Sequence, residues 1–244
     1  MAAPVQTQIR LPGKYHKQPV ISRLTSRYGL IFNITAASSP LGASNEGWFN
    51  IELSGNPEKL TNSLSYLQVL GVDLVQVEIA NQLKPSQVSE ILTNSSTIKS
   101  NPQKTINYEQ IVISHQLDYQ YQYQLLQSQN DITQKWYEYL SNTKSGQVTP
   151  ETEHNQTARL KLKLGILKRY QRQPIISKLV SDFSLTINIT SAILPDNACH
   201  DGLFELEIWG KLQQIHASLM YLEKLGMPLL IDASQESENE SMII

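Results

Sequence analysis

The sequence is poor in cysteine, in long apolar runs and in net charge, and each shortage excludes a class of protein. Among its 244 residues there is one cysteine, Cys199. A single cysteine excludes an internal disulfide, a CxxC redox pair and a cysteine-ligated iron–sulfur cluster within one chain. No stretch approaches the roughly 20 apolar residues of a membrane-spanning helix, and the N-terminus lacks the apolar segment of a secretory signal. We therefore expect a cytoplasmic protein without a membrane span.

Charge and motif content argue against several activities. The formal net charge of -2 at pH 7 argues against a nucleic-acid partner, since such proteins usually carry a basic excess. The five histidines show no metal-ligand spacing such as HxxxH, and no GxxxxGK[ST] phosphate-binding loop is present. Cys199, His200 and Asp201 stand together, but catalytic partners are brought together by the fold rather than by adjacency. We interpret them as a surface loop, and expect no enzyme activity, catalytic residue, metal or cofactor.

What the sequence does contain is an internal repeat with an offset of 155 residues (170 minus 15). The alignment needs no gap over 58 positions, of which 24 are identical. A fixed-offset similarity of this kind indicates a duplicated structural unit. The clearest matched segments are YHKQPVISRLTSRYGLIFNITAA (15–37) with YQRQPIISKLVSDFSLTINITSA (170–192), GWFNIELSG (47–55) with GLFELEIWG (202–210), and LSYLQVLGV (64–72) with LMYLEKLGM (219–227).

Within each copy the residue pattern predicts the order strand, helix, strand, strand, helix, strand. Alternating apolar residues predict strands, and apolar residues at helical spacing predict two helices, the second ending at Gly71 or Gly226. Pro19 and Pro174 suit a first helical turn. This order is the split βαβ unit of ferredoxin-like domains. We expect an α+β protein with two ferredoxin-like (βαββαβ) domains, each an antiparallel four-stranded sheet with two helices on one face. The predicted strands cover residues 5–11, 32–37, 48–54 and 74–77, and residues 160–166, 187–193, 203–209 and 228–231.

The remaining segments differ from the repeats in composition. Residues 81–156 are rich in Gln, Asn and Ser and read as a flexible linker, with a short amphipathic helix predicted around Trp136. Residues 234–244 form an acidic tail. The expected domains are therefore 1–80 and 157–233. We expect them to pack as an intramolecular pseudo-dimer, the pairing that single-domain proteins obtain as homo-oligomers; a homo-oligomer of the whole chain stays open.

Both copies carry the same short motifs in the same order. These are QPxIS at the helix opening (Gln18–Ser22 and Gln173–Ser177), an Asn-Ile start of the second strand, a Gly at each end of the third strand, and YLxxLG at the end of the second helix. On these motifs each copy resembles the NIL domain, a ferredoxin-like and ACT-like module at the C-terminus of the ATP-binding subunits of bacterial methionine importers. The eponymous Asn-Ile-Leu reads Asn33-Ile34-Thr35 and Asn188-Ile189-Thr190 here, so the third position departs from the pattern.

The resemblance implies ligand binding rather than chemistry. In the importers the domain binds methionine between paired domains, and the second-strand asparagine is tied to that binding. Carried over, this points to Asn33 and Asn188, with Thr35 and Thr190 beside them. Since the asparagines alternate with apolar residues, we expect them to point away from the core, and an amide suits an amino acid's carboxylate and ammonium. The alternative, that they stabilise a strand entry or a domain–domain seam, stays open.

The tryptophans suggest a second kind of surface. Trp48 and Trp209 alternate with core residues, so both should lie on the open face of a sheet, where an aromatic marks a packing site. Glutamates on the same faces argue against phosphate contacts. The leading hypothesis is thus a non-enzymatic regulatory protein that binds methionine or a related amino acid between its domains. The alternative is a ligand-free interaction module that docks an unidentified protein through the open faces and the linker.

Overall fold

The computed structural model of the chain describes residues 4–15, 17–39, 46–79, 124, 156–195 and 200–232. Both halves have the predicted order of elements, which confirms the α+β, βαββαβ prediction. The helix expected around Trp136 and the acidic tail lie outside the described residues. The first half comprises β1 (Val5–Leu11), the 3-10 turn η1 (Gly13–Tyr15), α1 (Ser22–Ser26), β2 (Ile31–Ser39), β3 (Gly47–Ser54), α2 (Pro57–Val69) and β4 (Asp73–Ile79). The second comprises β5 (Thr157–Ile166), η2 (Lys168–Tyr170), α8 (Ile175–Asp182), β6 (Thr186–Leu194), β7 (Gly202–Lys211), α9 (Leu212–Lys224) and β8 (Leu229–Asp232).

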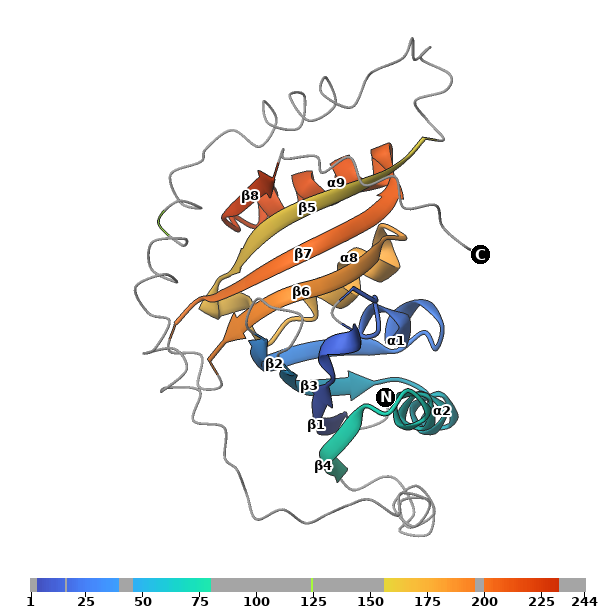
Figure 1. Cartoon of the computed structure of the whole chain (residues 1–244). Coiled ribbons are helices and arrows are strands. Elements are labelled where there is room, and N and C mark those ends of the chain that lie inside the picture. Colours follow the sequence, from blue (N-terminus) through green and yellow to red (C-terminus); the bar gives the residue numbers. More distant parts are fainter. Residues whose placement is uncertain are drawn as a thin grey trace.

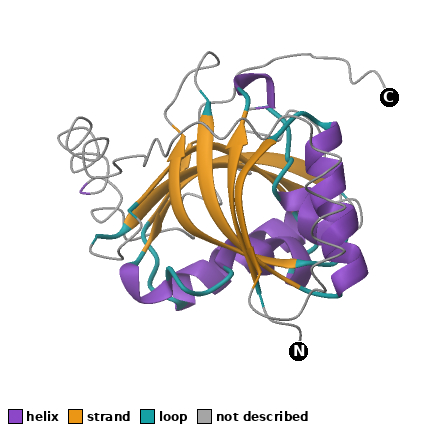
Figure 2. Cartoon of the chain, turned by 90° about the horizontal axis from the view of Figure 1, so that it is seen from below, coloured by secondary structure: helices purple, strands orange, loops and turns teal. Residues whose placement is uncertain are grey.

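The two four-stranded sheets are joined edge to edge into one sheet of eight strands, in the order β4-β1-β3-β2-β6-β7-β5-β8. The junction is an antiparallel pair of β2 and β6, formed by residues 37–39 and 192–194. Helices α1 and α8 pack against each other beside this junction, and the α-helices lie on one face of the curved sheet (Figures 1 and 2). We call the contact between the halves, made by β2, β6, α1, α8 and the turn after η2, the seam.

The hydrophobic core lies between the sheet and the helices. In β3 the alternating residues Phe49, Ile51 and Leu53 are fully buried, and Phe204, Leu206 and Ile208 occupy the equivalent positions of β7. The buried apolar side chains of both halves form one continuous cluster. The period-two pattern of the sequence therefore identifies the strand residues that face the helices, because every second residue of a strand faces the same side.

Two pairs of glycines explain part of the identity between the copies. Gly71 and Gly226 have φ of 74° and 67°, the left-handed conformation predicted for the residue after a helix. Gly55 and Gly210, at the end of the third strands, lie under leucine side chains. A Cβ at either position would stand 2.5 Å from a leucine Cδ2, of Leu30 and Leu185 respectively, so a larger residue there would displace the core.

The first helices begin differently from one another. Pro174 immediately precedes α8, whereas α1 begins at Ser22, three residues after Pro19. In both halves the proline carbonyl accepts the first helical hydrogen bond, from Arg23 N at 3.1 Å and from Lys178 N at 2.9 Å. The prolines therefore stand at the helix entry rather than inside the first turn.

Candidate functional site

The two asparagines lie on the strands that form the seam. Asn33 on β2 pairs with Glu52 of β3, and Asn188 on β6 pairs with Glu207 of β7, in register with the polar rather than the core residues of those strands. Despite this register both side chains are buried, with exposed fractions of 8% and 2%. The register places both side chains on the polar face of the sheet, and Asn33 contacts the second half of the chain there.

Asn33 is bound directly to the other half of the chain. Its Nδ2 donates a hydrogen bond to the backbone oxygen of Gln171, at 3.0 Å. Gln171 follows the 3-10 turn η2 and is itself 4% exposed. Its side-chain Nε2 donates to the backbone oxygen of His200, at 2.6 Å. The amide of Asn33 thus connects β2 to the start of β7 through one residue.

Thr35 and Thr190 occupy equivalent β-bulges. The pairing of β2 with β3 shifts between Ile34 and Ala36, and that of β6 with β7 shifts at the same place, so each threonine is the extra residue. The Thr35 hydroxyl donates to the Asn50 carbonyl at 3.3 Å, and the Thr190 hydroxyl donates to the Glu205 carbonyl at 3.1 Å. A bulge leaves the extra residue unpaired in the ladder. The threonine hydroxyl adds a hydrogen bond to the opposing strand there, which an Asn-Ile-Leu leucine could not make.

A chain of hydrogen bonds crosses the seam through the serine of the QPxIS motif. β2 and β6 pair over three residues each, so the N–H groups earlier on their facing edges need other partners. Phe32 N–H donates to Ser177 Oγ at 3.2 Å. Thr25 Oγ1 donates to the Leu30 carbonyl at 2.7 Å, so the 2.8 Å contact between the two hydroxyls is donated by Ser177. The chain of donors therefore runs from Phe32 N–H to the Ser177 hydroxyl, from there to the Thr25 hydroxyl, and finally to the Leu30 carbonyl.

The equivalent serine of the first half makes the reciprocal contact. Ser22 Oγ accepts from Ile187 N–H on β6 at 3.4 Å. The position equivalent to Thr25 is Val180 in the second half, and the Ser22 hydroxyl donates instead to the Pro19 carbonyl of its own half, at 3.2 Å. Each serine hydroxyl therefore accepts a hydrogen bond from the edge strand of the opposite half, as expected of a pseudo-twofold contact. The sequence did not predict this role, although the serine is identical in both copies.

A small cavity lies at the seam beside Asn33. About 20 Å³ of its space is open to the centre of a water molecule, which is room for about one water. β2 supplies three consecutive lining residues and the second half supplies the rest, none of them charged. They are Phe32, Asn33, Ile34, Ile166, Tyr170, Gln171, Gln173, Ile175, Ile176, Leu194 and Phe204. The lining combines apolar walls with amide groups.

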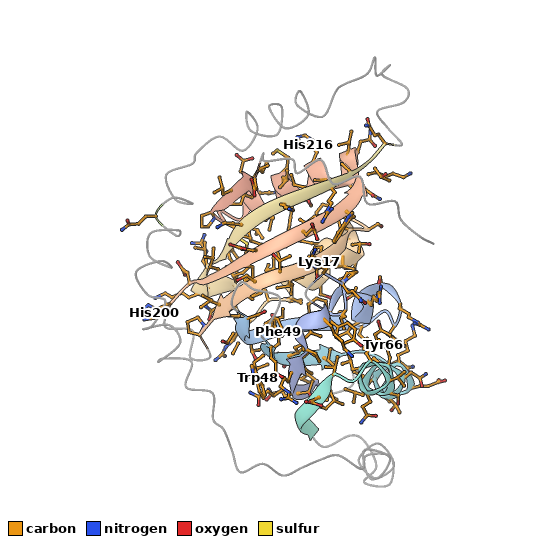
Figure 3. All side chains as sticks on the ribbon, in the orientation of Figure 1. Lys17, Trp48, Phe49, Tyr66, His200 and His216 are labelled. Atoms are coloured by element: carbon orange, nitrogen blue, oxygen red, sulfur yellow. The ribbon has the colours of Figure 1, made fainter. Side chains whose placement is uncertain are left out.

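The tryptophans lie on the other face of the sheet, each beside an arginine. The Arg10 guanidinium is 5.8 Å from the Trp48 ring centre, and that of Arg159 is 5.6 Å from the Trp209 ring centre. Arg10 also donates to Asp73, and this hydrogen bond raises the pKa of Arg10 above its ordinary value. Both rings are half-buried. Trp48 is labelled in Figure 3, beside Phe49 of the core.

Asp201 of the Cys-His-Asp sequence has a structural partner. Its Oδ1 accepts a hydrogen bond from Lys168 N–H, at 2.7 Å, while Cys199 lies outside the described residues. Within the described ranges, no group of three or more His, Cys, Asp and Glu side chains could hold a metal ion. A search of the same ranges finds no helix that is both long and apolar enough to cross a membrane.

Comparison with known proteins agrees with the repeat. An uncharacterised protein of Synechocystis sp. is 38% identical over 82 residues, which are 34% of this chain and 81% of that protein. An uncharacterised protein of Synechococcus elongatus is 31% identical over 72 residues, 30% of this chain and 89% of its own length. A solved structure proposed as a transcriptional repressor of the glycine cleavage system covers 95% of this chain and 97% of its own, at 9% identity. Its TM-score of 0.24 is too low to show a common fold.

The NIL domain pattern matches residues 6–75 and 161–229, more than half of the sequence. The chain therefore belongs to the NIL-domain family, with two copies of the domain in tandem.

Proposed function

We propose that this chain is a non-enzymatic regulatory protein that binds a small ligand at its seam, in the class of methionine and related amino acids. Asn33 and Asn188 provide the amide contacts, and Thr35 and Thr190 fix the strand geometry beside them. Membership of the NIL-domain family supports the proposal, since the importers' domains bind their ligand between paired domains.

The observation that carries the proposal is the burial of both asparagines on the two strands of the seam, with Asn33 next to a cavity with amide and apolar lining. An asparagine amide offers two donors and an acceptor, which can match both ends of an amino-acid backbone. Apolar walls such as Ile175 and Phe204 suit an apolar side chain. Because the cavity has room for about one water, an amino acid requires the walls to move apart.

A second candidate function is a ligand-free interaction module. The half-buried tryptophans favour it, since Trp48 and Trp209 lie on the sheet face opposite the helix-covered core. Aromatic and arginine side chains are enriched where proteins bind one another. The stacking of each ring against an arginine of its own half weakens this alternative, because that contact already covers part of the ring.

Calorimetric titration of the full chain with methionine and a panel of other amino acids tests the proposal. We expect saturable binding that is lost in the double variant Asn33→Ala, Asn188→Ala and retained in Asn62→Ala, an exposed asparagine of α2. Ligand at about 100 times its dissociation constant should also stabilise the protein by about 2.7 kcal/mol in a thermal-shift assay. Absence of binding across the panel, or binding that the double variant retains while folded, contradicts the proposal.

A further inference from the structure

We propose that Gln171 couples the seam to the two residues before β7, so that a change at Asn33 in the first half is transmitted to His200 and Asp201 in the second. This inference rests on the proposed function for its biological meaning, because the ligand would act at the same seam. The coupling itself depends on contacts within the chain, which can be tested without a ligand.

The 3-10 turn η2 is tied at both ends to the residues that precede β7. At its first residue, Lys168 N–H donates to the Asp201 carboxylate at 2.7 Å. After its last residue, the Gln171 side chain donates to the His200 carbonyl at 2.6 Å. Gln171 N–H also closes the turn onto the Lys168 carbonyl at 3.3 Å. A short turn fixed at both ends to adjacent residues moves together with them.

The same turn forms a wall of the seam cavity. Tyr170, Gln171 and Gln173 line it from the second half, and Asn33 lines it from the first. The backbone oxygen of Gln171 accepts the Asn33 hydrogen bond, while its side chain holds His200. One residue therefore has its main chain on the seam and its side chain on the segment before β7. A ligand that takes over the Asn33 amide, or widens the cavity, must release or displace Gln171.

The receiving segment is placed to report such a change outside the seam. His200 is exposed, and Figure 3 places it at the end of the sheet where β6 and β7 are connected. From Gly202 onward the chain is fixed by pairing with β5 and β6. The response is therefore confined to the residues before the strand. The residue equivalent to Gln171 in the first copy is His16, which lies outside the described residues, so the coupling is assigned to the second half.

Hydrogen–deuterium exchange of the full chain tests the coupling without ligand. Asn33→Ala removes the seam contact to Gln171, and Gln171→Ala removes the contact to His200. We expect both to raise amide exchange at Lys168, whose N–H donates to the Asp201 carboxylate, about fivefold, the factor that one hydrogen bond of typical net strength contributes to a local opening equilibrium. Thr25→Val is the matched control, because it removes another cross-seam hydrogen bond, to Ser177, that does not involve η2.

The control separates coupling from general loosening of the seam. We expect Thr25→Val to leave amide exchange at Lys168 unchanged. Equal increases in Asn33→Ala and Thr25→Val, or no increase in Asn33→Ala, would overturn the inference. Cys199, the one cysteine of the sequence, adjoins His200, and the rate at which a disulfide reagent modifies it gives a second readout that should follow the same order.

Addition of methionine separates this inference from the proposed function. Binding by calorimetry with altered amide exchange at Lys168 supports both. Binding without any altered exchange overturns the coupling and leaves the proposed function intact. No amino-acid binding, together with the expected response to Asn33→Ala, contradicts the proposed function and supports the coupling.

Discussion

Replacement of Ser177 by alanine is expected to weaken the contact between the two halves by about 2 kcal/mol. The Ser177 hydroxyl accepts from Phe32 N–H and donates to Thr25 Oγ1, so the variant removes a partner from two buried groups. A buried donor or acceptor left without its partner costs about 1–3 kcal/mol. Ser22→Ala should cost about 1 kcal/mol, because Ser22 receives a longer bond, 3.4 Å from Ile187 N–H, and donates within its own half.

Urea unfolding followed by circular dichroism measures these costs. With a slope of about 2 kcal/mol per molar urea, the midpoint should fall by about 1 M for Ser177→Ala and about 0.5 M for Ser22→Ala. Ser181→Ala is the control, since Ser181 is exposed on the same helix and its hydroxyl bonds only the neighbouring Asp182. If the midpoint of Ser177→Ala falls no further than that of Ser22→Ala, or matches that of Ser181→Ala, the hydrogen-bond order across the seam is wrong.

Two further substitutions test single features of the halves. The Thr7 hydroxyl is buried and has no hydrogen-bond partner among the described residues, so Thr7→Val should raise the free energy of unfolding by about 1 kcal/mol; a lowered urea midpoint would contradict this. Ser184 has a positive φ of 53° where the first copy has Gly29, with φ 61°. Ser184→Gly should therefore raise the stability by about 0.5–1 kcal/mol, and Gly29→Ser should lower it by a similar amount. Changes of the same sign in thermal melts of the two variants would refute the backbone argument.

The folds of the halves could be predicted from sequence because their cores are periodic. Phe49, Ile51 and Leu53 alternate with polar residues, and the structure buries all three. The bulge at Thr35 was not predictable in this way, because one extra residue in a strand leaves the composition unchanged while it shifts the pairing. The junction of β2 with β6 also had no sequence signal, since backbone pairing between edges depends little on side-chain identity.

The candidate site could be predicted in part. The family resemblance pointed to Asn33 and Asn188, which lie on the two strands of the seam, and Asn33 binds the second half. That either asparagine binds a ligand stays a prediction. Gln171, which binds Asn33, was not predicted, because its counterpart in the repeat is His16 and the contact joins residues 138 apart. Ser177 offered one usable signal, its identity with Ser22 in a motif that lies at a helix opening. That signal does not reveal that the hydroxyl serves the other half.

The motif residues that identify the family therefore have a pairing role that requires no ligand. The QPxIS serines accept hydrogen bonds from the edge strand of the opposite half, and the Asn33 amide donates to the turn after η2. A ligand at this seam has to replace the bond between Asn33 and Gln171 and to enlarge a cavity that has room for about one water. Its affinity is then reduced by the free energy of opening, and a bound ligand favours the opened seam by the difference between its affinities for the opened and the closed state. Because the two halves pack closely at the seam, a small ligand that binds there would change the contacts between them.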